Sequence, residues 1–153
     1  MGARVIGLGQ PAAGDDGVGL AILDRIREMG APAGTMLFEA REATSLIPLL
    51  ETAEPIVLVD AVVGHGTVGE VLELDAHALD LRPEGPRALS THGVDVGQAI
   101  ALARVLSPGA ISSRIWLVGV TIARPDRYVH GLSPAVRAAI PRAALAVLTR
   151  VSR

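Results

Sequence analysis

The chain has 153 residues, half of them hydrophobic and 20% charged, a composition that favours a folded domain with a real core over a disordered segment. Fourteen basic and sixteen acidic residues leave a net charge of −2, so no basic surface for nucleic acid or an anionic membrane is expected. The absence of cysteine excludes disulfides, thiolate metal sites and a cysteine nucleophile. With no signal-peptide pattern and no membrane-spanning run, we expect one cytoplasmic domain over residues 1–153.

Apolar runs alternate with amphipathic stretches along the chain. In chain order the sequence predicts a strand over 4–9, a helix over 16–27, a strand over 35–40, a short helix over 43–52, a strand over 55–60, an edge strand over 69–75, an irregular connection over 76–90, a helix over 93–106, a strand over 115–122 and a helix over 133–150. This alternation predicts an α/β fold, a single three-layer α/β/α domain with a mostly parallel, roughly five-stranded sheet.

Polar residues follow the predicted strands, at the sheet edge where open α/β folds bind their ligands. Asp15 and Asp16 stand after the glycine-rich loop of the first strand, and Asp60 ends the strongest apolar strand. His92 lies in a Ser-Thr-His-Gly turn before the third helix. We expect Asp16, Asp60 and His92 to converge on one rim, where two oxygens and one nitrogen suit a borderline divalent metal. The same three groups could instead carry out acid–base chemistry without a metal.

The aspartates also have purely structural interpretations. Asp15 can cap the first helix and Asp16 can complement its dipole, although the glycines around them suggest a backbone kept bare so that something can approach. Asp60 can accept backbone N–H groups from the following turn, because an unpaired charge at the end of an apolar strand is costly.

The sequence evidence for functional histidines is weaker than that for the aspartates. A helix N-terminus disfavours imidazolium, so His92 is expected to be neutral and able to act as a ligand. His77 and His130 are expected on the surface, and so is His65, although its position five residues after Asp60 would let it reach the same rim.

The first loop also matches, weakly, the dinucleotide-binding fingerprint. Gly7, Gly9 and Ala12 fit G-x-G-x-x-[G/A], and Glu39 closes the second strand where an acid that binds ribose is expected. The following helix N-terminus, however, carries two aspartates that would repel pyrophosphate. A nucleotide-binding module is therefore the alternative interpretation of this loop.

Five motifs run in order along nearly the whole chain: Gly7-x-Gly9, Gly14-Asp-Asp-Gly-Val-Gly19, Val59-Asp-Ala61, Ser90-Thr-His-Gly93 and Gly131-Leu-Ser-Pro134. Their order and spacing resemble the hydrogenase maturation proteases. These are small α/β endopeptidases that trim the C-terminus of the large subunit of nickel–iron hydrogenases. One position departs from the family pattern, since Gln10 stands where the family usually has Asn.

The resemblance implies that Asp16, Asp60 and His92 are both the catalytic and the metal-contacting residues. It implies that these residues recognise nickel already lodged in the precursor, so nickel is supplied by the substrate and no permanent metal is expected. The expected partner is a nickel-loaded hydrogenase large-subunit precursor, and we expect the enzyme to be a monomer. A non-catalytic relative that binds the precursor without cleaving it is a further alternative.

Overall fold

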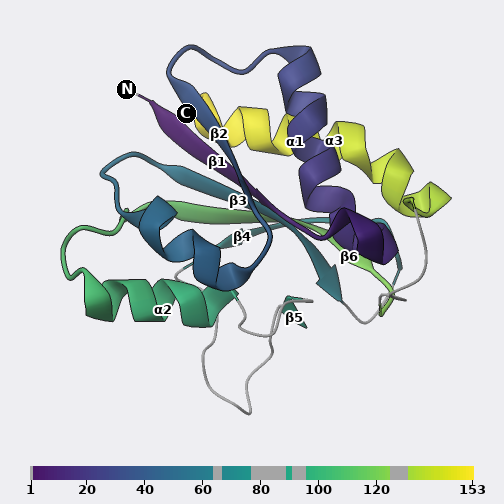
Figure 1. Cartoon of the computed structure of the whole chain (residues 1–153). Coiled ribbons are helices and arrows are strands. Elements are labelled where there is room, and N and C mark those ends of the chain that lie inside the picture. The colour runs from purple at the N-terminus through teal and green to yellow at the C-terminus, as the bar shows by residue number, and fades with distance from the viewer. Residues whose placement is uncertain (1, 64–66, 77–88, 91–95, 125–130) are drawn as a thin grey trace.

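A twisted sheet forms the centre of the molecule, with helices on both of its faces (Figure 1). This computed structural model describes residues 2–63, 67–76, 89–90, 96–124 and 131–153. The strands are β1 (Ala3–Leu8), β2 (Thr35–Ala40), β3 (Ile56–Val63), β4 (Val71–Asp75), β5 (Leu89–Ser90) and β6 (Ile115–Ile122). The helical segments are η1 (Pro11–Gly17), α1 (Val18–Met29), η2 (Ala43–Leu50), α2 (Val96–Leu106) and α3 (Pro134–Val151).

The strands follow the order β2-β1-β3-β6-β4, with β5 pairing with β3 off this path. Strands β2, β1, β3 and β6 are parallel, and β4 runs antiparallel to β6 at one end of the order. The predicted α/β class with a mostly parallel sheet is therefore confirmed, as is the position of β4 at an edge.

Two apolar cores lie on opposite faces of the sheet, one under α1 and α3 and the other under η2 and α2. The central strand β3 serves both, because successive side chains of a strand point to opposite faces. Val57, Val59 and Ala61 pack toward α1 and α3, whereas Ile56 and Leu58 pack toward η2 and α2. A strand buried on both faces has the continuous apolar sequence that made this segment predictable.

Two strand predictions need correction. The sequence predicts that the strongest strand ends at Asp60, but β3 continues to Val63 because β6 pairs with it as far as the Val63–Ile122 partners. The sequence also predicts an irregular connection over 76–90, but Leu89–Ser90 forms β5 and pairs antiparallel with the end of β3.

The helix predictions differ mainly at their ends. The predicted helix over 16–27 begins at Val18 as α1, because the residues before it form the 3₁₀ helix η1, in which Gly14 has a positive φ of 63°. The predicted helix over 43–52 is the 3₁₀ helix η2, which contains Pro48; proline has no N–H to donate to an α-helical bond. In the part of the chain that the structure describes, no helix combines the length and apolarity that a membrane span requires.

Candidate active site

The two aspartates predicted as site residues lie where the winding of the sheet reverses. Strands β1 and β3 are neighbours, but α1 leads from β1 to β2 on one face, whereas η2 leads from β2 to β3 on the other. A reversal of this kind opens a crevice beyond the carboxyl ends of the strands, where α/β folds bind ligands. Asp16 reaches this edge from η1 and Asp60 from β3, and their residues are only 3% and 1% exposed.

Glycines in the first loop and at the beginning of α1 let the chain pack closely against the strands. A Cβ atom on Gly19 would overlap the carbonyl oxygens of Leu8 and Val59, the second at 2.6 Å. A Cβ atom on Gly9 would lie 2.7 Å from the carbonyl oxygen of Asp16. The lack of a side chain at Gly19 thus allows close packing against the ends of β1 and β3, and not the approach of an outside ligand. The same contacts hold the loop that carries Asp16 beside the strand that carries the second aspartate.

Asp60 lies between the residues of β3 that pair with β1 and those that pair with β5. On one side β1 pairs as far as Val59 and β5 begins opposite Val62, while on the other side Asp60 pairs with Gly119 of β6. Its Oδ1 atom accepts the N–H of Ala61 at 2.8 Å. The structural interpretation of Asp60 therefore holds for this bond, although the donor belongs to the strand and not to a turn.

Alternation along β3 also sets the face on which Asp60 lies. It continues the row of Ile56 and Leu58, which packs toward α2. Val96, the first residue of α2, belongs to the same core cluster. Asp60 is therefore on the face of the sheet that the beginning of α2 covers.

Asp15 serves a different helix from the one predicted. Its carboxylate accepts two bonds from Ser133, which precedes α3 by one residue: the backbone N–H donates to Oδ1 at 2.6 Å and the hydroxyl donates to Oδ2 at 2.8 Å. Gly17 occupies the N-cap of α1 instead. The prediction that Asp15 caps the first helix is thus wrong, because its partner lies 118 residues away in the sequence.

The structure describes two of the three predicted site residues. His92, like His65, His77 and His130, lies outside the described residues. Among the residues that are described, no three acids or histidines are grouped closely enough to hold a metal ion. The structure therefore brings Asp16 and Asp60 to one edge of the sheet and leaves the third residue as a prediction.

Glu39, which suggested a nucleotide site, and Gln10, which departs from the family pattern, both have bonding partners within the protein. Glu39 forms an ion pair at 3.4 Å with Arg27 of α1. The side-chain amide of Gln10 donates to the carbonyl oxygen of Arg41 at 3.1 Å and so ties the first loop to the segment after β2. The family departure at this position is therefore accommodated by a loop-to-loop bond.

One further polar residue at this end of the sheet was not predicted. Thr121 of β6 is 8% exposed, and its hydroxyl donates to the carbonyl oxygen of Thr67 at 2.7 Å. The same oxygen accepts the N–H of Glu70 at 2.8 Å. Thr121 therefore anchors the loop that leads into β4, and no local sequence signal distinguishes it from other strand threonines.

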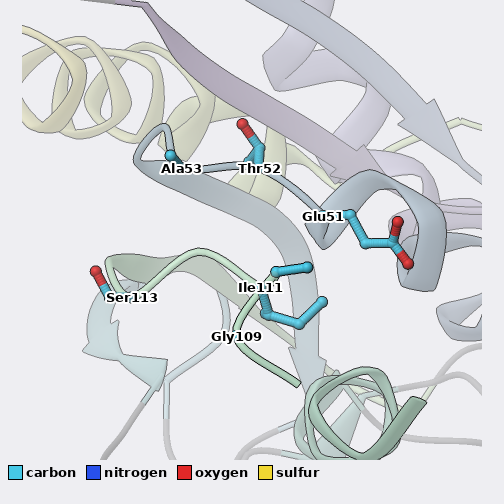
Figure 2. Close-up of a pocket in the computed structure, with 7 residues that line it drawn as sticks. Glu51, Thr52, Ala53, Gly109, Ile111 and Ser113 are labelled. Atoms are coloured by element: carbon cyan, nitrogen blue, oxygen red, sulfur yellow. The ribbon is translucent and has the colours of Figure 1, made fainter. Parts of the chain in front are cut away.

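A pocket opens at the opposite end of the sheet (Figure 2). It has a volume of about 580 Å³ and lies between residues 51–53, which precede β3, and residues 109–113, which precede β6. Glu51 is the one ionisable residue in its lining, and this carboxylate accepts the hydroxyl of Ser107 at 2.6 Å. Because the pocket lacks a group of catalytic side chains, we assign the candidate active site to the carboxyl edge instead.

Comparisons with known proteins concern the chain as a whole. Residues 22–150 match the model of a family described as hydrogenase maturation protease, whereas a comparison with curated proteins gave no match. Among solved structures, the hydrogenase maturating endopeptidase HybD from E. coli is 20% identical, with 99% of this chain and 93% of that chain covered and a TM-score of 0.77. The maturation protease HybD from Thermococcus kodakarensis is also 20% identical, with 99% of both chains covered and a TM-score of 0.78.

A third structure, the maturation protease HycI from Thermococcus kodakarensis KOD1, is 19% identical, covers 99% of this chain and 92% of its own, and has a TM-score of 0.74. At these identities the solved structures show a shared fold, which extends over the glycine loop that carries Asp16. The family match spans most of the chain, including the positions of Asp60 and His92. The chain therefore belongs to the hydrogenase maturation protease family and is a peptidase.

Proposed function

We propose that this peptidase removes the C-terminal extension of a nickel–iron hydrogenase large-subunit precursor after nickel has been inserted. The observation that carries the proposal concerns two buried aspartates at the reversal point of the sheet: Asp16 follows β1, and Asp60 lies in the neighbouring strand β3. They come from separate segments of the chain. Both are buried, although carboxylate side chains usually lie on the protein surface in contact with water. In a chain of this family, such a pair favours recognition of a cation at the site of cleavage.

The precursor supplies the cation. Carboxylate oxygens together with an imidazole nitrogen form a donor set that a borderline divalent metal such as nickel accepts. In this proposal Asp16, Asp60 and His92 contact nickel that the precursor already holds, and the enzyme has no permanent metal. Contact with the nickel seats the precursor tail across the crevice, so an empty precursor is not trimmed. We further propose that the enzyme acts as a monomer in the cytoplasm.

Chain connectivity supports the inclusion of His92. Ser90 of β5 pairs with Val62 of β3, two residues beyond Asp60. His92 follows Ser90 by two residues, a span of at most about 7 Å of extended chain. We therefore propose that His92 contributes to the site from the short segment between β5 and α2.

Trimming of a nickel-loaded precursor by single-site variants tests the proposal, with the product detected by mass spectrometry. We expect Asp16→Ala, Asp60→Ala and His92→Ala each to abolish trimming while the urea unfolding transition stays cooperative. Asp60→Asn is the sharper variant, because its amide oxygen still accepts the Ala61 N–H while the negative charge is lost. Asp24→Ala is the matched control, since this aspartate is exposed on α1 and pairs only locally with Arg27 in the described contacts.

The outcomes separate the parts of the proposal. Normal trimming by the Asp16 and Asp60 variants would overturn the assignment of the site. Trimming of a nickel-free precursor by the wild type would overturn recognition through nickel. Binding of the loaded precursor by the wild type without any cleavage would identify a non-catalytic relative.

A further inference from the structure

The two adjacent acids of the first loop have separate surroundings. Asp16 is buried at the reversal point, whereas Asp15 is half-buried and accepts both the backbone N–H and the hydroxyl of Ser133. These two bonds, at 2.6 and 2.8 Å, join the loop after β1 to the beginning of the last helix. We call this pair of bonds the Asp15–Ser133 clamp.

The clamp replaces the usual local cap of α3. A serine at the N-cap normally accepts an N–H from its own helix, but Ser133 makes no such side-chain bond and its hydroxyl donates to Asp15 instead. In a capping box, an acid three residues into the helix accepts the N-cap N–H. Here Asp15 takes that place from 118 residues away. The usual capping bond within the helix is thus replaced by a bond to a residue distant in the sequence. Such departures from local sequence rules are typical of functional sites.

The beginning of α3 is a firm anchor for the clamp. Gly69, which precedes β4, has a φ of +91°, and a Cβ atom there would lie 2.6 Å from the carbonyl oxygen of Ala135. Arg142, further along the helix, donates to the carbonyl oxygen of Gly69 at 3.1 Å. The N-terminal turns of α3 are therefore fixed to the sheet, and a group bonded to Ser133 is fixed with them.

Asp16 is consequently held from two sides. On one side its carbonyl group lies against Gly9 at the end of β1, where even a Cβ atom would not fit. On the other side its neighbour Asp15 is bonded to the beginning of α3. We propose that Asp15 is a positioning residue, which sets the place of Asp16 at the crevice by clamping η1 to α3. This inference rests on the proposed function, because it gives Asp15 a role through the carboxylate of Asp16.

The test compares single-turnover cleavage of a nickel-loaded precursor at saturating enzyme, which reports the cleavage step rather than binding. We expect Asp15→Ala to slow this step by about a hundredfold, because a displacement of about 1 Å in a catalytic group has an effect of that size. Asp15→Asn keeps an oxygen for the Ser133 N–H and an amide that can donate to the hydroxyl, so we expect most of the rate to return. Ser133→Ala removes one of the two bonds, and its effect is expected to lie between those of the two Asp15 variants.

A matched control separates positioning from general loss of stability. Ser112 is 2% exposed, and its hydroxyl donates to the carbonyl oxygen of Glu54 at 2.6 Å, close to the amino ends of β3 and β6. The same oxygen contacts the backbone of Arg114 at 3.2 and 3.3 Å, so Ser112→Ala removes a buried group of bonds far from the crevice. We expect it to lower the urea midpoint as Asp15→Ala does while leaving the cleavage step at its wild-type rate.

Two results would overturn the inference. If Asp15→Ala cleaves at the wild-type rate, or no more slowly than Ser112→Ala, then the clamp only stabilises the fold. Asp16→Ala, assayed alongside, distinguishes this from failure of the proposed function. A dead Asp16→Ala variant beside an active Asp15→Ala variant overturns the positioning role alone, whereas an active Asp16→Ala variant overturns both.

Discussion

Replacing Gly19 with alanine tests how closely α1 must approach the sheet. The new Cβ atom would lie 2.6 Å from the carbonyl oxygen of Val59 and closer still to that of Leu8, whereas ordinary contact begins at 3.4 Å. Because both obstacles are backbone atoms, α1 has to move away by about 0.8 Å or more, and overpacking of this kind costs about 3 kcal/mol. The higher helix propensity of alanine offsets about 1 kcal/mol of this cost. The free energy of unfolding should therefore fall by about 2 kcal/mol.

Urea denaturation measures this loss, and cleavage of a nickel-loaded precursor measures its effect on the site. Since η1 leads directly into α1, a shift of this size also displaces Asp16, and we expect cleavage to slow by about a hundredfold. Gly109→Ala is the control, because nothing lies within 4 Å of its Cβ position and only its φ of +79° is unfavourable. That variant should lose about 1 kcal/mol and cleave normally. A Gly19→Ala protein with the urea midpoint and cleavage rate of the wild type would refute the packing argument.

Two further substitutions test polar contacts at the same end of the sheet. Thr121→Val removes the hydroxyl that bonds Thr67 and Glu70, so the free energy of unfolding should fall by about 2 kcal/mol. Thr121→Ser should recover most of this loss. A valine variant as stable as the wild type would contradict the anchoring role of Thr121. Gln10→Ala removes an exposed bond to the carbonyl oxygen of Arg41, so we expect a loss below about 1 kcal/mol in urea denaturation and an unchanged cleavage rate, and a large loss of cleavage would assign Gln10 a part in the site.

The centre of the sheet was largely predictable because β1, β3 and β6 are buried along nearly their whole length. The segments around Leu58 and Val118 are continuous runs of aliphatic residues, which a strand covered by helices on both sides requires. Strand ends were less predictable, because they depend on the partner. Asp60 looks like a terminus in the sequence, yet β3 continues past it, since β6 supplies partners as far as Ile122.

The sequence predicts candidate site residues but not the contacts that hold them in place. Asp16 and Asp60 could be proposed from the sequence because each is a polar residue after an apolar run, and parallel strands bring their carboxyl ends to one edge. Nothing near Asp15 in the sequence shows that its partner is Ser133, since the two meet only when the last helix packs. The sequence also does not show why residue 19 is a glycine, because the lack of a side chain allows either a ligand or a neighbouring strand to approach the backbone.

The distance in sequence between Asp15 and Ser133 also fixes when the site can form during synthesis. The glycine loop is made first, but its clamp waits for a residue made 118 positions later, and contacts so far apart form late in folding. Strand β6, the neighbour of β3 in the sheet, is likewise made after two-thirds of the chain. A nascent chain that has not yet reached Ser133 therefore cannot form the clamp.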